Sequence, residues 1–325
     1  MNSRRPRVVI VCPAEFTFTD NAATVEQPLL SDVAEVTTVW LAFNVPLPPE
    51  VLTADALILW HGPQITATEL AMMPHCRAII RNGVGYDSVD IKAAADAGIP
   101  VCNVPDYGTE EVADHALALT LALYRQLFPL DAEAKRLGWK ITVAPRMRRL
   151  RTQTFGLIGL GRIGMATALR AKAFGFRTVF YDPYAVVGMH KAVGVERVGT
   201  LDELLRAADV ISIHCPLSPE TRGLIGAREI ALLRPGAFLV NTARGDIVQK
   251  KAVFDSLRSG HLGGAGLDVV EAEPLRTAEE ASTPNLIVTC HAAFCSPEGL
   301  IEMRSTSARI ARAAVLGLPV WNRVN

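Results

Sequence analysis

Residues 154–164 of the chain read Thr-Phe-Gly-Leu-Ile-Gly-Leu-Gly-Arg-Ile-Gly, a short apolar run followed by glycines spaced GxGxxG. The run predicts a buried strand, and the pattern after it predicts a helix. At this junction Gly159 permits a tight turn, Gly161 lets the backbone approach a phosphate, and Gly164 allows close helix packing. Free N–H groups at the helix start attract an anion. The segment therefore predicts a doubly wound domain that binds a dinucleotide.

The next predicted strand, residues 178–181, ends at Asp182, 18 residues after Gly164. An acidic side chain there accepts hydrogen bonds from the ribose hydroxyls of NAD and repels the 2′-phosphate of NADP. The alternative is a plain turn residue before Pro183, because Asp-Pro sequences favour turns. We predict that NAD is the cofactor.

Short runs rich in Val and Ile alternate with helical patterns along the chain, which predicts parallel sheets covered by helices. The alternation occurs twice in 325 residues, so we expect the α/β class with two Rossmann-like doubly wound domains. Long helices are expected at residues 109–127 and 297–316. The expected strands are residues 7–12, 36–40, 56–59, 78–81 and 101–103, then 154–158, 178–181, 210–214, 238–241, 265–268 and 286–289.

The composition argues against several classes of partner. Lys plus Arg equals Asp plus Glu at 33 each, so no net charge attracts nucleic acid or an anionic membrane. No apolar stretch reaches the ~20 residues of a membrane span, and no cleavage signal follows the start. Six cysteines without paired CxxC spacing indicate reduced, largely buried thiols. We expect a cytoplasmic protein with a small ligand, no metal, no nucleic acid and no membrane partner.

Three reactive side chains follow later strands. Arg244 comes after the strand at 238–241, Glu273 after the next, and His291 after the last. A guanidinium can hold a carboxylate and polarise the adjacent keto oxygen, and an imidazole can protonate that oxygen as hydride arrives. Glu273, bonded to the other ring nitrogen, would fix the tautomer. Each residue alone reads as a surface or structural group, but together at one sheet edge they predict a catalytic set.

His214 competes with His291 for the role of proton donor, because it also ends a predicted strand. The sequence identifies no glutamate placed to support it. We therefore prefer His291 and expect the segment around His214 to line the nucleotide pocket.

The chain resembles the D-isomer-specific 2-hydroxyacid dehydrogenase family over nearly its whole length, close to the branch of phosphoglycerate dehydrogenases and C-terminal-binding protein corepressors. The segments that carry the resemblance are residues 82–90, 103–114, 159–164, 241–245 and the Glu-Pro pair at 273–274.

The resemblance implies a discontinuous substrate domain, residues 1–104 plus 297–325, and an NAD-binding domain, residues 105–296. It implies that Arg244 binds and polarises the substrate, Glu273 supports the histidine, and His291 donates the proton, while Asp268 contacts the nicotinamide region. The cofactor-binding residues implied or predicted are Gly159, Gly161, Arg162, Ile163, Gly164, Asp182, Cys215, Pro216, Thr221, Thr242, Ala243, Asp268 and His291.

On the substrate side, the resemblance implies that Val84 and Gly85 offer backbone N–H groups to the substrate carboxylate. Arg81 matches an arginine that reaches the substrate in the related branch, which hints at a second anionic or polar group, although a surface ion pair is the alternative. The expected substrate-binding residues are Arg81, Val84, Gly85, Arg244 and Phe294.

Two positions depart from the family pattern. Phe294 stands where the corepressors have tryptophan, and Cys290 stands where the family usually has proline, whose loss would relax the loop before His291. Family members are usually dimers joined by an arm, for which residues 127–140 are the candidate. Trp139 is either an interface anchor or partly buried in its own subunit.

The leading hypothesis is an NAD-dependent enzyme that interconverts a 2-keto acid and a D-2-hydroxy acid. An NADH-responsive, corepressor-like binding protein is the alternative from another class, and a dehydrogenase for a non-carboxylate such as phosphite is a third. The sequence does not determine which keto acid is the substrate.

Overall fold

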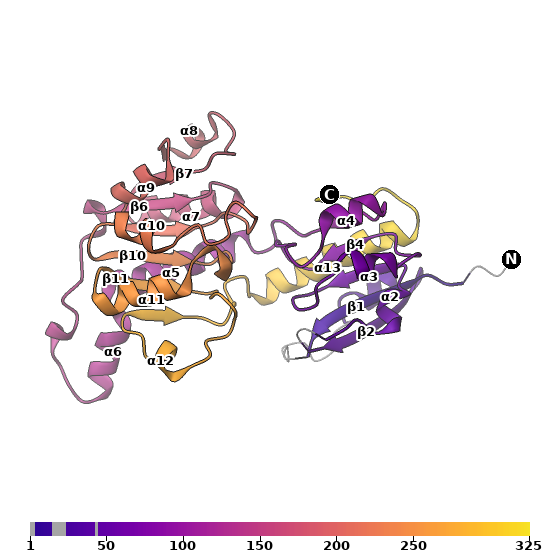
Figure 1. The fold of residues 1–325 in the computed structure, drawn as a ribbon, viewed down its shortest axis with the longest axis horizontal. Coiled ribbons are helices and arrows are strands. Elements are labelled where there is room, and N and C mark those ends of the chain that lie inside the picture. The colour runs from indigo at the N-terminus through magenta and orange to yellow at the C-terminus, as the bar shows by residue number, and fades with distance from the viewer. Residues whose placement is uncertain (1–3, 15–23, 43–44) are drawn as a thin grey trace. The chain divides into compact units, whose positions relative to one another are not determined.

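The computed structural model describes residues 4–14, 24–42 and 45–325. The chain divides into two compact units, one formed by Met1–Gly108 with Ser296–Asn325 and the other by Thr109–Cys295. Figure 1 shows a sheet with helices around it in each unit. Both sheets are parallel throughout, so the predicted α/β class with two doubly wound domains is confirmed.

The first unit is built on a five-stranded sheet in the order β2-β1-β3-β4-β5. The C-terminal helix α13 returns to this unit and packs on β3 and β4, so the yellow helix in Figure 1 lies with the indigo strands. The elements are β1 (Arg7–Pro13), α1 (Gln27–Leu30), β2 (Glu35–Leu41), α2 (Pro49–Leu52), β3 (Ala56–Leu59), α3 (Ala67–Ala71), β4 (Ile79–Arg81), α4 (Ile91–Asp96), β5 (Val101–Cys102) and α13 (Pro297–Val315).

The second unit is built on a seven-stranded sheet in the order β12-β11-β10-β9-β6-β7-β8. The chain order reverses between β6 and β9, and doubly wound sheets bind ligands at the carboxyl ends of strands beside such a switch point. The strands are β6 (Thr154–Ile158), β7 (Arg177–Tyr181), β8 (Glu196–Arg197), β9 (Val210–Ile213), β10 (Ala237–Asn241), β11 (Leu262–Leu267) and β12 (Leu286–Val288).

Helices cover both faces of this sheet, so its central strands β6, β9, β10 and β11 are buried. Phe155 and Leu157 of β6 pack in one cluster with residues of α5 and α7, while Ile158 packs in the other with residues of α9, α10 and α11. The helices are α5 (Thr109–Arg125), α6 (Leu127–Lys135), α7 (Arg162–Ala173), α8 (Met189–Val193), α9 (Leu201–Ala207), α10 (Ala227–Leu232), α11 (Lys250–Ser259) and α12 (Ala278–Ala281), with 3₁₀ turns η1 (Ile141–Val143), η2 (Leu150–Thr152) and η3 (Gly245–Ile247).

Helix α5 lies unusually close to β11. A Cβ placed on Gly266 would come within 2.9 Å of Leu119 Cβ, so the strand tolerates the helix only because it lacks a side chain there. The helix ends at Arg125, two residues before the predicted end, because Gln126 adopts a left-handed conformation with φ of +49°. Helix α6 then starts as a separate element.

The predicted strands all appear, with bounds that differ by a few residues, and β8 is one that the sequence did not indicate. The six cysteines are free thiols, and Cys290 and Cys295 are exposed, so the expected burial holds for part of the set. Among the described helices, none has the length and apolar character needed to cross a membrane.

Candidate active site

The glycine-rich turn after β6 leads directly into α7. Gly159 has φ of +95°, and a Cβ there would come within 2.8 Å of the backbone of His214. Gly161 is the N-cap of α7, and a Cβ at this position would meet nothing within 4 Å. The helix N-terminus therefore opens onto space at Gly161, where its N–H groups can hold a pyrophosphate.

Asp182 follows β7 and is oriented by backbone amides. One carboxylate oxygen accepts a hydrogen bond from Leu160 N at 2.9 Å, within the glycine-rich turn, and the other accepts one from Tyr184 N at 2.8 Å. Each oxygen has further acceptor capacity for a ribose hydroxyl. The arrangement fits the adenosine ribose of NAD, and the fixed negative charge opposes a 2′-phosphate.

Thr221 and Thr242 belong to the loops expected around the dinucleotide. The hydroxyl of Thr221 donates to the carbonyl of Pro216 at 2.6 Å and accepts from Ser218 N at 2.8 Å, so it shapes the loop after Cys215. Thr242 Oγ1 is buried and has no hydrogen-bond partner among the described residues. A buried hydroxyl without a protein partner suits a polar ligand atom.

His214 lies beneath the glycine-rich turn. It is half-buried, its Nε2 is 2.8 Å from Ser212 Oγ, and burial lowers its pKa from 6.5 to about 3. The ring is therefore neutral near pH 7. A neutral imidazole in this position is poorly suited to donate a proton to a substrate.

Arg244, Glu273 and His291 follow the carboxyl ends of β10, β11 and β12, which are neighbours in the sheet. His291 Nδ1 lies 3.1 Å from Glu273 Oε2; the His291 side chain is half-buried and that of Glu273 is exposed. The carboxylate therefore orients the imidazole through Nδ1, so proton transfer to a substrate would take place at Nε2. Among the predicted catalytic residues, the structure pairs these two.

Arg244 is held by its own turn. Its carbonyl accepts a hydrogen bond from Asn241 Nδ2 at 2.8 Å, and its guanidinium donates to the carbonyl of Ala243 at 2.8 Å. The side chain is partly exposed at the end of a buried strand. Such a guanidinium can bind a carboxylate with two parallel hydrogen bonds.

Phe294 is 8% exposed, and its ring stands edge-on to His291, with centroids 6.4 Å apart. This contact is aromatic packing beside the imidazole. Its predicted contact with the substrate remains a prediction.

Asp268, at the end of β11, is almost entirely buried and binds the loop that carries His291. Its carboxylate accepts hydrogen bonds from Ala292 N at 2.9 Å, Ala293 N at 3.0 Å and the hydroxyl of Thr289 at 2.5 Å. Its backbone carbonyl accepts from His291 N at 2.8 Å. Sequence reasoning assigned Asp268 to the nicotinamide region and missed this binding of the loop.

In the first unit, Arg81 ends β4 and is 4% exposed. Its guanidinium donates to the carbonyl of Asn82 at 2.6 Å and to that of Leu59 at 3.3 Å. The loop after it is anchored because the carbonyl of Val84 accepts from Asn103 Nδ2 at 2.7 Å. The substrate contacts of Arg81, Val84 and Gly85 remain predictions.

Two further polar residues were missed by sequence reasoning. Ser212 is fully buried within the apolar strand β9, and His115 belongs to α5, whose neighbouring positions form a buried stripe. The only signal in the sequence was a polar residue within an apolar pattern, which by itself is commonly structural. Their partners, His214 and Thr289, become evident only in the fold.

Comparisons with known proteins find similarity to one family of dehydrogenases. The family model for the D-isomer specific 2-hydroxyacid dehydrogenase, NAD binding domain, matches residues 117–293. The C-terminal-binding protein 1 of Caenorhabditis elegans is 34% identical over 305 residues, which is 90% of this chain and 42% of that protein. The D-3-phosphoglycerate dehydrogenase of Mycobacterium leprae is 38% identical over 272 residues, 84% of this chain and 51% of that protein. The chain thus spans about half the length of these curated relatives.

Among solved structures, D-lactate dehydrogenase from Aquifex aeolicus, complexed with NAD and lactic acid, is similar with a TM-score of 0.85 and 28% identity. The similarity covers 95% of this chain and 96% of that one. The TT0316 protein from Thermus thermophilus has a TM-score of 0.84 and 32% identity, covering 98% and 100% of the two chains.

Acidification should destabilise the folded chain through His214. Because its pKa is about 3 when folded and 6.5 when free, the unfolded chain binds an extra proton between these values. The free energy of unfolding therefore falls as the pH drops below 6.5, by up to about 1.4 kcal/mol per pH unit. Urea unfolding from pH 7 to 5 should show a shallower fall for His214→Gln, whereas the exposed control His75→Gln should match the wild type. Equal falls in all three proteins would contradict this account.

A methyl group at Gly161 should weaken cofactor binding without destabilising the fold. It would occupy the open space at the start of α7 and touch no protein atom. We expect Gly161→Ala to raise the Kd for NADH by at least ~10-fold, about 1.4 kcal/mol, and to leave urea unfolding of the free protein nearly unchanged. In contrast, the methyl group of Gly164→Ala would overlap the carbonyl of Gly159, so this variant should impair both NADH binding and the stability of the fold. An unchanged Kd in Gly161→Ala would place the pyrophosphate elsewhere.

Proposed function

Because the chain belongs to the D-isomer-specific 2-hydroxyacid dehydrogenase family, we propose that it is an NAD-dependent enzyme that interconverts a small 2-keto acid and its D-2-hydroxy acid. The observation that carries the proposal is the contact between His291 Nδ1 and Glu273 at the sheet edge that also bears Arg244. A protein that only senses nucleotide has no chemical need for this set. The similar Aquifex structure holds NAD and lactic acid, which supports the substrate class.

The residues present fit NAD. The turn from Gly159 to Gly164 accepts a pyrophosphate, Asp182 accepts the ribose hydroxyls, and Thr242 Oγ1 offers a buried hydroxyl. When bound, the reduced nicotinamide supplies the hydride that is added to C2 of the keto acid. All other steps depend on side chains of the chain itself.

Arg244 is proposed to bind the substrate carboxylate and to polarise the keto oxygen, which accumulates negative charge as C2 becomes tetrahedral. His291 donates its Nε2 proton to that oxygen, and in the reverse direction Nε2 accepts the proton of the hydroxyl group. Glu273 stabilises the doubly protonated imidazole at Nδ1. Arg81, Val84, Gly85 and Phe294 are proposed to complete the substrate site.

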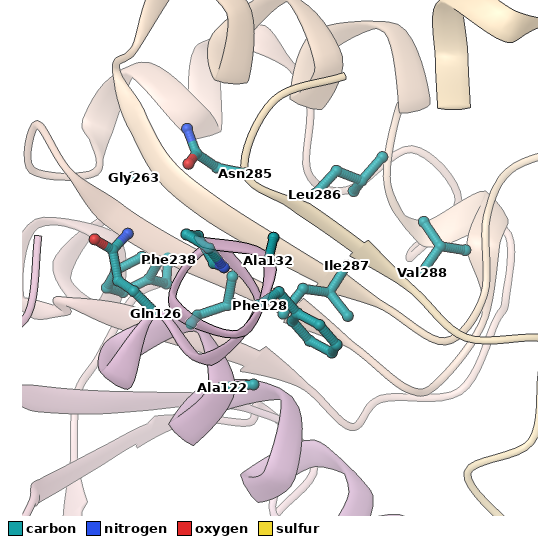
Figure 2. A pocket seen from close by; sticks show the side chains of 12 residues that line it. Ala122, Gln126, Phe128, Ala132, Phe238, Gly263, Asn285, Leu286, Ile287 and Val288 are labelled. Atoms are coloured by element: carbon teal, nitrogen blue, oxygen red, sulfur yellow. The ribbon is translucent and has the colours of Figure 1, made fainter. Parts of the chain in front are cut away.

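We also propose that the protein is a homodimer joined through the second unit. A cavity of about 490 Å³ lies against the edge strand β12, and Figure 2 shows Phe128, Ile287 and Val288 lining it. In the adjoining segment, Trp139 is 91% exposed, so it is not buried in its own subunit. Large exposed apolar groups mark interaction surfaces, and the cavity and Trp139 lie on the same unit, as a self-complementary interface requires.

The proposed location is the cytoplasm, a reducing compartment that suits six free cysteines.

The substrate class is tested by NADH oxidation against a panel containing glyoxylate, hydroxypyruvate, phosphohydroxypyruvate, phenylpyruvate and 2-ketogluconate. We expect turnover of at least one keto acid, faster with NADH than with NADPH because of Asp182. His291→Ala should lower kcat by at least ~100-fold, the usual contribution of a general acid, while the exposed control His75→Ala retains wild-type turnover. Tight NADH binding without turnover on the panel would instead favour the NADH-responsive binding protein.

The dimer is tested by light scattering coupled to size-exclusion chromatography. The wild type should elute with twice the mass of the 35.1 kDa chain. Trp139→Ser should shift the equilibrium toward the monomer because it removes the largest exposed apolar group of the segment. Tyr184→Ser, at an aromatic residue that is 84% exposed outside the segment, should leave the mass unchanged. A monomeric wild type, or a dimer unaffected by Trp139→Ser, would contradict the proposed interface.

A further inference from the structure

The loop that carries His291 has a backbone conformation that needs support. His291 has φ of +52°, in the left-handed region that residues other than glycine rarely adopt. Such a conformation persists only when surrounding contacts hold it. The supporting contacts therefore help to determine where the imidazole lies.

Asp268 supplies most of these contacts. It accepts one hydrogen bond before His291 in the chain, from Thr289, one from His291 N, and two after it, from Ala292 and Ala293. Carboxylate oxygens accept hydrogen bonds, and both oxygens of Asp268 accept one from a backbone amide. The hydroxyl of Thr289 must therefore be the donor in its contact with Asp268.

The direction of this hydrogen bond determines whether a second histidine, His115, donates or accepts in its contact with Thr289. Thr289 Oγ1 also lies 2.9 Å from Nε2 of His115, which projects from α5. A hydroxyl has one proton, and that proton is committed to Asp268. His115 must therefore carry a proton on Nε2 and donate it to Thr289. The same Nε2 is 3.7 Å from Asp268 Oδ1, so protonation of the ring would add attraction to the carboxylate.

We propose that His115 is a positioning residue for His291: through Thr289 and Asp268 it fixes the loop on which the proton donor stands. The chain of contacts links helix α5, the end of β11 and the end of β12. The close packing of α5 on β11 at Gly266 brings the helix near enough for this contact. A role of His115 in catalysis rests on the proposed function, whereas its role in fixing the loop does not.

Two matched pairs of variants test the proposal. His115→Gln retains a side-chain N–H donor, and His115→Leu removes it at similar size. Thr289→Ser retains the hydroxyl, and Thr289→Val removes it with the same shape. We expect kcat to fall at least ~10-fold in His115→Leu and Thr289→Val, as when a group supporting a reactive side chain is lost, while the Kd for NADH changes less than twofold. His115→Gln and Thr289→Ser should recover most of the activity.

A second measurement needs no substrate. Hydrogen exchange of the peptide spanning residues 289–295, followed by mass spectrometry, reports on the amides of Ala292 and Ala293 that donate to Asp268. Exchange should be faster in His115→Leu and Thr289→Val than in their partner variants. Thermal melts identify any variant that fails to fold, in which case the other pair decides.

The outcomes distinguish the proposed function from the positioning role of His115. Absence of turnover in the wild type, with faster loop exchange in His115→Leu and Thr289→Val, would overturn the proposed function and keep the positioning role. Unchanged loop exchange in those two variants would overturn the positioning role whatever the activity. Equal loss of kcat in His115→Gln and His115→Leu would show that packing, and not hydrogen-bond donation, is what His115 contributes.

Discussion

Parallel pairing of the strands in the second unit is the constraint on which the site depends. Because β6, β9, β10, β11 and β12 all run in the same direction, the segments that leave their carboxyl ends emerge at one edge of the sheet. Residues as distant in sequence as Gly159 and His291 are thereby brought to the same edge. No local preference of either residue could achieve this, because it results from the pairing of strands that are themselves only three to six residues long.

At that edge, the surroundings give two histidines different properties. His214 lies beneath the glycine-rich turn, where burial lowers its pKa to about 3 and its Nε2 contacts Ser212. His291 lies in the loop after β12, and Glu273 Oε2 is 3.1 Å from its Nδ1, a contact that orients the ring. Both residues are histidines. They differ because His214 directly follows a buried strand, whereas His291 lies in a loop.

The sequence predicted those features whose cause is local or strongly periodic. The glycine-rich turn, Asp182 and the buried strands follow from spacing, and the α/β class follows from their alternation. The break between α5 and α6 was not predicted, because Gln126 is no signal for a left-handed residue. His115 was missed for a different reason: its contact joins residues 115, 268 and 289, and only the packing of α5 on β11 brings them together.

The resemblance to the dehydrogenase family implied that Asp268 contacts the nicotinamide region, and the contacts of its carboxylate with the loop around His291 were not predicted. The structure shows another use for that charge: three hydrogen bonds to the carboxylate offset the cost of its burial and hold a strained loop in place. A buried carboxylate that binds the segment around a reactive residue contributes to the chemistry through geometry, which sequence spacing alone does not reveal.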